Sequence, residues 1–377
     1  MKKNSTVQQS SKQRAKGTKS CKGSITIGMD LGDKTSRYCV IDQEGEVLFE
    51  GAVATTKKGL AQTFGVLARC RIALEVGAHS PWISRLLKSF GHEVIVANAR
   101  QVKLISESSR KNDRLDAQTL ARLARMDPKL LRPIQHRSEE AQQDLMLIRV
   151  RAGLVEARTA LVNSARGLAK AIGERLPKCD ADNLDVKRLE GLPAGLEIVL
   201  KPLLEEVKSL TEKIHACDEQ IEQIARTKYP EIARLKQVSG VGTLIALTFV
   251  LTLEDPARFR KSRDVGCYVG MKPKSHDSGD RQSQLGISKE GDVCLRKLLV
   301  QGAHCILGRR GPDTDLKRWG EKLCARGGKN ARKRALVAVA RKLGILLHRL
   351  WVTGEVYQPL RNSQARQVAA QAKQQAA

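Results

Sequence analysis

The sequence predicts an α/β domain, a long helical segment and a strongly basic third region, in that order. Strand-like and helix-like segments alternate between residues 24 and 126. Two series of apolar residues at heptad spacing occupy the middle of the chain, and Lys and Arg accumulate after residue 257. A chain of 377 residues, 41% of them hydrophobic, can hold two or three domains with buried cores, which excludes wholesale disorder.

The net charge indicates a polyanionic partner. The chain has 67 Lys and Arg against 40 Asp and Glu, a formal net charge of +27. Nucleic acid is the favoured partner. An anionic membrane surface is the weaker alternative, because no basic amphipathic helix with aromatic anchors is evident. Aromatic residues make up only 3% of the chain, which argues against binding of single strands by base stacking.

Targeting and cysteine patterns favour a cytoplasmic protein. No apolar run is long enough to span a membrane, and the N-terminus lacks the apolar segment of a secretory signal. The nine cysteines are odd in number, widely spaced and without a Cys-x-x-Cys motif. They indicate reduced thiols rather than a zinc site or a disulfide framework.

The predicted α/β domain follows a basic N-terminal segment. Residues 1–23 contain Lys and Arg but no acid, which predicts a disordered tail, either a solvated extension or an arm that grasps nucleic acid. The elements that follow have the order β-β-β-α-β-α-β-α, which predicts a mixed sheet with helices on both faces. The predicted strands are Ser24–Leu31, Ser36–Ile41, Glu46–Ala52, Ile72–Val76 and Glu93–Ala97, and the predicted helices are Lys58–Arg69, Pro81–Phe90 and Asp113–Met126.

The middle of the chain contains two apolar seams, separated by a segment rich in Pro, Gly and Asp at about residues 176–195. Their lengths predict a coiled-coil hairpin at a subunit contact. The alternative is a pair of amphipathic helices that lie on a globular core. The first seam is Leu145, Ile148, Ala152, Val155, Thr159, Val162 and Ala169, and the second is Leu203, Val207, Leu210, Ile214, Cys217, Ile221 and Ile224.

The third region carries most of the excess positive charge. Residues 258–349 hold 23 Lys and Arg against 8 Asp and Glu, a net charge of +15, which predicts a footprint for phosphate backbones. The glycines of Val238–Gly242 precede the apolar stretch Thr243–Leu253. Such glycines can hold a phosphate on the backbone amides of a helix start, as helix-hairpin-helix DNA binders do, or can simply make a tight turn.

Four carboxylates form a candidate metal site. Asp30 and Glu75 each end an apolar strand, and Asp113 and Asp116 share one face at the start of a helix. If they converge at one sheet edge, their oxygens suit Mg²⁺, and a two-metal site of this kind can clamp a phosphodiester. The alternative is that Asp113 is an N-cap and Asp116 complements the helix dipole. Asp33 and Asp42, near the same strands, are the likeliest decoys.

A serine in a basic segment is the second candidate. Ser278 lies between a predicted helix, Ala257–Tyr268, and another at Asp292–Ile306. We expect it on a glycine-rich loop, where a serine amid cations can attack a phosphodiester, although an ordinary turn has the same composition. Lys111, Arg114, Arg281, Lys289 and Arg296 are candidate phosphate contacts.

Together these motifs resemble one family, the DEDD-type insertion-sequence transposases of the family numbered one hundred and ten, with the related pilin-gene invertases. In the N-terminal part the resemblance rests on Gly28–Gly32, Ala73–Gly77 and Lys111–Ala117. In the C-terminal part it rests on Gly240–Gly242, Arg258–Phe259, Tyr268–Pro273, Ser278-Gly279, Ile287–Gly291, Leu295-Arg296, Ala335–Leu343 and Tyr357.

The predicted α/β domain spans residues 24–135, the coiled-coil hairpin 136–234 and the basic region 235–350, with a tail at 351–377. The resemblance implies that the first is a RuvC-like, RNase H-type domain and the third a mainly helical transposase domain, in a cytoplasmic protein that associates with the bacterial nucleoid when it is bound to DNA. It implies that Asp30, Glu75, Asp113 and Asp116 bind metal and that Ser278 is the nucleophile of a serine recombinase. A bridge RNA would pair with donor and target DNA, and the protein would form dimers that assemble into tetramers. The alternatives are a metal-dependent nuclease or junction resolvase without serine chemistry, and a non-catalytic nucleic-acid scaffold.

Overall fold

The computed structural model describes residues 25–98, 113–278 and 281–364, without the side chains of residues 113, 275–278 and 281–284. The predicted basic tail and Lys111 lie outside these ranges. The chain divides into two compact units, Met1–Arg137 and Ser138–Ala377. Every cysteine in the described ranges is a free thiol.

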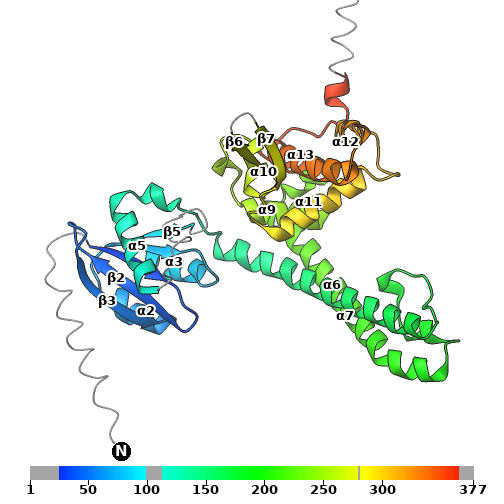
Figure 1. Cartoon of the computed structure of the whole chain (residues 1–377), viewed down its shortest axis with the longest axis horizontal. Helices are drawn as coiled ribbons and strands as arrows, with labels where there is room; N and C mark the ends of the chain where they lie inside the picture. Colours follow the sequence, from blue (N-terminus) through cyan, green and yellow to red (C-terminus); the bar gives the residue numbers. More distant parts are fainter. Residues whose placement is uncertain (1–24, 99–112, 279–280, 365–377) are drawn as a thin grey trace, which may run out of the picture. The chain divides into compact units, whose positions relative to one another are not determined.

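Unit 1 contains the predicted mixed sheet, with the strand order β3-β2-β1-β4-β5 (Figure 1). Strands β1 and β2 and strands β2 and β3 pair antiparallel, whereas β1 with β4 and β4 with β5 pair parallel. The turn between β2 and β3 is held by Asp42, whose Oδ1 accepts hydrogen bonds from the amides of Gly45 and Glu46, both at 2.8 Å. The strands are β1 Thr26–Asp30, β2 Thr35–Ile41, β3 Val47–Ala54, β4 Arg71–Glu75 and β5 Glu93–Ala97.

The helices of unit 1 cover the two faces of the sheet with different kinds of side chain. Helices α2 (Lys57–Phe64) and α3 (Ser80–Ser89) pack large apolar residues such as Phe64 and Ile83 against Met29, Ile72 and their neighbours. Helix α5 (Asp113–Met126) covers the other face, where many contacts are made by Ala and Gly. Small residues let α5 approach the strand backbones closely, and this fixes the position of its first turn.

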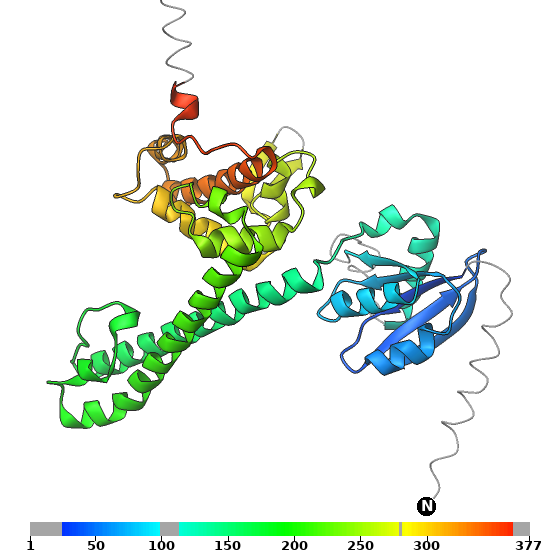
Figure 2. The ribbon, with the colours of Figure 1, turned by 180° about the vertical axis from the view of Figure 1, so that it is seen from behind.

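Unit 2 begins with two long helices, α6 (Glu139–Ala171) and α7 (Ala194–Lys228), which pack against each other as an antiparallel pair (Figure 2). Their connection contains two short 3-10 turns, η4 (Ala181–Asn183) and η5 (Val186–Leu189), which close a small apolar core at the tip of the pair. The helices therefore form a hairpin within one chain, and its coiled-coil geometry and its role at a subunit contact stay predictions.

Polar contacts at heptad spacing set the register of this hairpin. Asp144 of α6 accepts hydrogen bonds from Lys228 Nζ and from the hydroxyl of Tyr229, at 3.2 and 2.9 Å. Seven residues on, Arg151 Nη2 donates to Asp218 at 3.0 Å. Seven further on, the buried Arg158 donates to Thr211 Oγ1 at 3.0 Å and pairs with Asp182. Because a slip in register would leave these groups unpaired, they specify one alignment.

Arg158 also corrects one predicted seam position. The heptad series places Thr159 in the contact between the helices, but Thr159 is exposed and Arg158 is buried. The long aliphatic stem of an arginine can line an apolar contact while its guanidinium reaches a carboxylate. A pattern search that accepts only apolar residues at seam positions cannot find it.

The rest of unit 2 is a helical body around α9 (Thr243–Leu253), which is apolar on all sides and almost wholly buried. The predicted helix at 257–268 is wrong, because the chain forms a 3-10 turn, η6 (Pro256–Arg258), and then a separate helix, α10 (Arg263–Tyr268). The other helices are α8 Ile232–Leu235, α11 Val293–Ile306, α12 Asp315–Ala325 and α13 Ala331–Thr353.

The body also holds a two-stranded hairpin and a docked C-terminal segment. Strands β6 (Pro273–Ser278) and β7 (Arg281–Ile287) pair antiparallel. After α13 the chain returns to α12, where the Asp315 amide donates to the carbonyl of Pro359 at 2.7 Å and the Asp315 carboxylate accepts from the Asn362 amide at 2.6 Å. The first residues of the predicted tail therefore belong to α13 and to the packed segment that follows it. Residues 365–377 lie outside the described ranges.

The mixed sheet of unit 1 is consistent with a RuvC-like domain, and the second unit is mainly helical, as the sequence predicts. No helix in the described part of the chain has the length and apolar content needed to cross a membrane.

Candidate active site

Asp30 and Glu75 lie side by side at one edge of the sheet. Each is the last residue of its strand, β1 or β4, and the register pairs Met29 with Leu74 one position earlier. Because β1 and β4 run parallel, both strands end at the same edge. Both carboxyl residues are partly buried there.

The face of the sheet that carries these acids is the face beneath α5. A Cβ atom on Gly28 would lie 2.0 Å from the carbonyl oxygen of Ala117 in α5, so α5 rests directly on β1 at this residue. Ala73, which pairs with Gly28, is buried against the same helix. Residues two apart in a strand share a face, which places Asp30 and Glu75 on the α5 side.

The direction of α5 brings its first turn to the same edge. The middle of α5 lies over Gly28, whereas Ala124 near its end accepts a hydrogen bond from Arg71 Nη1, at the start of β4, at 3.0 Å. The helix therefore runs opposite to β1 and β4. Its beginning, with Asp113 and Asp116, lies towards the ends of the strands that carry Asp30 and Glu75. We call this region the acidic corner.

The acidic corner does not form a closed cluster in the described part of the structure. No three His, Cys, Asp or Glu side chains there are spaced as metal ligands, and the side chain of Asp113 lies outside the description. The backbone positions bring the four predicted residues to one edge of unit 1. Their oxygen-only donor set is the kind that hard divalent cations prefer.

Two arginines lie beside the acidic corner. Arg37 of β2 is paired opposite Asp30 in the register and is exposed. Arg114, predicted to contact phosphate, forms an ion pair with Glu50 of β3 while its side chain stays 70% exposed. Cys39, beneath α5, is unreactive, because burial and the nearby Glu50 raise the pKa of its thiol to about 11.

The two expected decoys differ in position. Asp42 follows β2, which runs antiparallel to β1, so it lies at the opposite edge of the sheet and holds a turn. Asp33 lies three residues after Asp30, and its Oδ1 is 3.3 Å from Nε2 of His79. His79 also accepts a hydrogen bond from Trp82 Nε1 at 3.2 Å. Asp33 therefore links the loop after β1 to the loop after β4.

No sequence pattern predicted the partly buried pair of Ser80 and His136, and its role is structural rather than catalytic. Ser80 Oγ donates to the carbonyl of Gly77 at 2.8 Å, so His136 Nε2, at 2.9 Å, donates to this hydroxyl. Burial, with Arg85 and other nearby cations, lowers the pKa of His136 to about 4. A neutral histidine that donates to a buried hydroxyl does not activate it as a nucleophile. The residues lie 56 apart in sequence, and no motif connects them.

Ser278 lies at the end of a strand, so the predicted loop is wrong. Its backbone pairs with Arg281 across the connection of the β6–β7 hairpin, and residues 279–280 of that connection lie outside the description. The segment Pro273–Ser278 is polar and lacks the alternation that marks a half-buried strand, so its composition does not separate a strand from a loop. The hairpin places the backbones of Ser278 and Arg281 opposite each other at the connection between its strands.

Two glycines fix the base of this hairpin. A Cβ atom on Gly270 would lie 1.8 Å from the carbonyl oxygen of Glu290, and one on Gly291 would lie 2.0 Å from that of Tyr268. The segments before β6 and after β7 therefore touch backbone to backbone. Lys289, in the second segment, is exposed and has a left-handed backbone, with φ of 59°. It stays a candidate phosphate contact.

Arg296 has a structural role that the sequence did not indicate. Its Nη1 donates to the carbonyls of Val269 and Glu290, both at 3.0 Å, and so ties together the segments at the base of the hairpin. An arginine that donates to two backbone carbonyls has fewer donors left for a phosphate.

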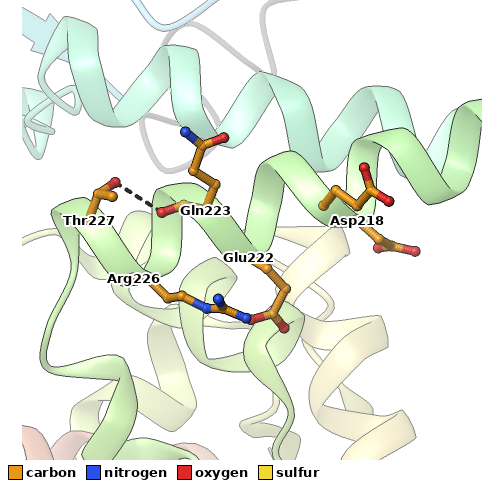
Figure 3. A pocket seen from close by; sticks show the side chains of 6 residues that line it. Asp218, Glu222, Gln223, Arg226 and Thr227 are labelled. Carbon is orange, nitrogen blue, oxygen red and sulfur yellow. Dashed lines mark hydrogen bonds between the residues drawn. The ribbon is translucent and has the colours of Figure 1, made fainter.

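An open hollow on α7 has the wrong charge for nucleic acid. Figure 3 shows Asp218, Glu222, Gln223, Arg226 and Thr227 along its wall, and Glu219 completes the lining. Its volume is about 490 Å³. The carboxylates outnumber the single cation, so a phosphate backbone would be repelled.

Comparisons with known proteins agree with the motifs. Residues 27–173 match the DEDD transposase family of IS110, and residues 232–318 match the transposase family IS116/IS110/IS902. The chain is 31% identical to the transposase for insertion sequence element IS1111A of Coxiella burnetii, over 91% of this chain and 93% of that protein. It is 28% identical to a probable family 20 transposase of Pseudomonas aeruginosa, over 88% of this chain and 98% of that protein.

A third relative is the transposase for element IS1328 of Yersinia enterocolitica, which is 30% identical over 75% of this chain and 84% of that protein. The matched ranges include the acidic corner in unit 1 and the β6–β7 hairpin, with Ser278, in unit 2. The chain therefore belongs to the IS110-type DEDD transposases, enzymes that cleave and rejoin DNA.

Proposed function

We propose that this transposase is a recombinase in which Ser278 attacks a phosphodiester of DNA beside Mg²⁺ ions held by Asp30, Glu75, Asp113 and Asp116. The placement of Asp30 and Glu75 at the ends of adjacent parallel strands, with α5 directed towards the same edge, is the observation that carries the proposal.

The divalent metal has support from the family, which does not specify the ion. The donors here are all carboxylates, and hard oxygen donors favour Mg²⁺ over softer transition metals. When bound, the ions would neutralise charge that develops on the phosphate. Asp30 and Glu75 would be fixed by the sheet, while Asp113 and Asp116 would depend on the seating of α5 on Gly28.

The serine chemistry is supported by the match of Ser278 to the nucleophile position of the family that the sequence resembles. In the proposed step Ser278 Oγ loses its proton and bonds to phosphorus, and the bond from phosphorus to one sugar oxygen breaks. That oxygen takes up a proton and leaves as a hydroxyl. Attack by a hydroxyl of another DNA end reverses the step and releases the serine, so rejoining needs no external energy source.

A matched pair of substitutions tests the serine. Ser278→Ala should abolish strand cleavage and the covalent protein–DNA adduct detected on a denaturing gel. Ser275→Ala, which removes a hydroxyl from the same strand, should leave both at the wild-type level. Cleavage that persists in Ser278→Ala would show that another group, such as water, is the nucleophile.

Guidance by a bridge RNA and assembly into dimers and tetramers are the finer parts of the proposal. The net charge of +27 suits a protein that holds RNA and DNA together, because base pairing can then read the target sequence. RNA should co-purify with the protein, and its sequence should contain loops complementary to the flanks of the element. Mixing Asp30→Asn with Ser278→Ala protein should restore activity if one protomer's serine completes its partner's acidic corner.

A metal-dependent nuclease or junction resolvase is the second candidate. One observation favours it: the acids and the sheet of a RuvC-like domain lie wholly within unit 1, which does not contain Ser278. Under this alternative the Ser278→Ala protein would cleave a four-way DNA junction with Mg²⁺ at the wild-type rate and form no adduct.

A further inference from the structure

A second open hollow, in unit 2, lies between the glycine turn before α9 and the loop that follows α11. Its volume is about 560 Å³. We call it the glycine hollow. Its lining consists of Gly240, Cys305 and the loop residues Gly308, Arg309, Arg310, Gly311 and Pro312.

Three of the seven residues that line the glycine hollow are glycines, and two of these pack tightly on α11 and its C-terminal loop. Gly240 has φ of 82°, and a Cβ atom there would lie 2.8 Å from the carbonyl oxygen of Gly302 in α11. A Cβ atom on Gly311 would lie 2.4 Å from the carbonyl oxygen of Ile306. The turn and the loop therefore have no room for side chains at these positions. The amides of Gly308 and Gly311 already donate to the carbonyls of Cys305 and Gly308, so the groups that can bind a ligand here are mainly side chains.

The lining of the glycine hollow includes two arginines whose charge is not neutralised by an acid in the described part of the chain. Arg309 and Arg310 are exposed, and within the described residues neither side chain forms a hydrogen bond or an ion pair. Two arginines elsewhere in unit 2 differ, since Arg318 is held by Asp313 and Arg361 by Glu355. The lining contains no carboxylate, in contrast to the hollow on α7.

The chemistry of the lining selects the ligand. Guanidinium groups suit the non-bridging oxygens of a phosphodiester. No aromatic side chain lines the hollow, so an unpaired base has nothing to stack on. The backbone of a duplex is therefore favoured over a single strand.

We propose that the glycine hollow is a contact site for the phosphate backbone of duplex DNA, with Arg309 and Arg310 as its cations. The inference uses the family's action on DNA and does not depend on the chemistry of Ser278. It also gives a role to the glycines of Val238–Gly242, which otherwise form only a turn.

Stabilisation of α11 is the competing explanation for the two arginines. They follow the end of α11, where cations interact favourably with the helix dipole. In that case their removal would lower the melting temperature and leave DNA binding unchanged. If the arginines contact phosphate instead, their removal would weaken DNA binding and leave the melting temperature unchanged. The two explanations are therefore separable.

The test measures how DNA affinity depends on salt. Full-length protein is titrated by fluorescence anisotropy against a random-sequence DNA duplex, from about 50 mM to about 200 mM KCl. The variant is Arg309→Gln with Arg310→Gln. The control is Arg318→Gln with Arg361→Gln, which removes the same charge from the same unit at residues already paired with acids. Both arms are repeated with an RNA duplex, and melting curves are recorded for all proteins.

For the variant, the slope of log affinity against log salt should become shallower by about 1.8, or about 0.9 for each phosphate that is no longer neutralised, with affinity reduced about tenfold at low salt. The control should change the slope by less than half as much. An equal change in both proteins would show an effect of net charge alone and overturn the proposal. A change confined to the RNA duplex would refute the assignment to DNA, and an unchanged slope would refute the site.

Discussion

Replacing Gly28 by Ala should disable the acidic corner without touching any of its acids. The added Cβ atom would lie 2.0 Å from the carbonyl oxygen of Ala117 and 2.4 Å from the amide nitrogen of Ala121. Both are backbone atoms of α5, so no side chain can rotate away. The helix must move by about 1 Å or more to restore an ordinary contact.

Two effects of this displacement can be estimated. Overpacking of a buried contact costs about 3 kcal/mol, which corresponds to a fall of about 10 °C or more in the melting temperature of a unit of this size. Asp116 precedes Ala117 and moves with the helix, and a shift of about 1 Å at a reacting centre reduces the rate about 100-fold. Cleavage should therefore fall far more than the folded fraction at the assay temperature.

The assay compares Gly28→Ala with Gly77→Ala. Gly77 lies two residues after Glu75, and a Cβ atom there would meet nothing within 4 Å. DNA cleavage is measured at saturating Mg²⁺ and well below the melting transition, with duplex binding recorded separately. Gly77→Ala should behave like the wild type. If Gly28→Ala cleaves and melts like Gly77→Ala, the argument that α5 positions the acids is refuted.

Three further predictions follow from the contacts described above. Asp30→Asn and Glu75→Gln should each reduce Mg²⁺-dependent cleavage more than about 100-fold, while Asp42→Asn, the same change at the opposite edge of the sheet, should leave it intact; equal losses would contradict a metal site. His136 is neutral in the fold because its pKa is lowered from 6.5 to about 4. Between these two pH values only the unfolded chain binds a proton at this residue, so the stability of unit 1 should be full above pH 6.5 and decrease by on the order of 2 kcal/mol as the pH falls from 6.5 to about 4. Urea unfolding of the wild type and His136→Gln measures this, and the variant should lose the dependence. Asp144→Ala should lower the free energy of unfolding of unit 2 by about 2 kcal/mol, because it removes the acceptor of the Tyr229 hydroxyl and leaves Lys228 with Glu140 as its only carboxylate among the described residues. Arg151→Ala, in the more exposed pair with Asp218, should cost under about 1 kcal/mol; similar losses would show that burial does not set the cost.

The sheet of unit 1 was predictable because its strands are short apolar runs bounded by turn residues. The same patterns identified Asp30 and Glu75, since acids that end buried strands are conspicuous. The contact of α5 with the sheet was not predictable, because Gly28 reads equally well as part of a strand or of a turn. Only the fold shows that its missing side chain admits Ala117 and Ala121.

The C-terminal region was harder to predict because its signals are local and ambiguous. The segment that ends at Ser278 has the composition of a loop, yet it pairs with residues 281–287 as a strand. The break in the predicted helix at 257–268 follows from Pro256, which starts a 3-10 turn, and from Phe259, which packs against Tyr268 and His348 at ring distances of 5.3 and 5.5 Å. Long-range packing therefore overrode helical spacing here.

Some motif residues are proposed metal ligands and others hold the fold together, and loss of activity alone does not distinguish these two roles. Asp30 and Glu75 are carboxylates at the ends of apolar strands, and metal binding would explain their identity. Arg296 lies in a motif of equal prominence, yet it binds two carbonyls at the base of the hairpin. Substitution of either kind would abolish recombination. A change in metal dependence should follow only from the acids, and a change in thermal stability chiefly from Arg296, so both quantities are needed to assign a role.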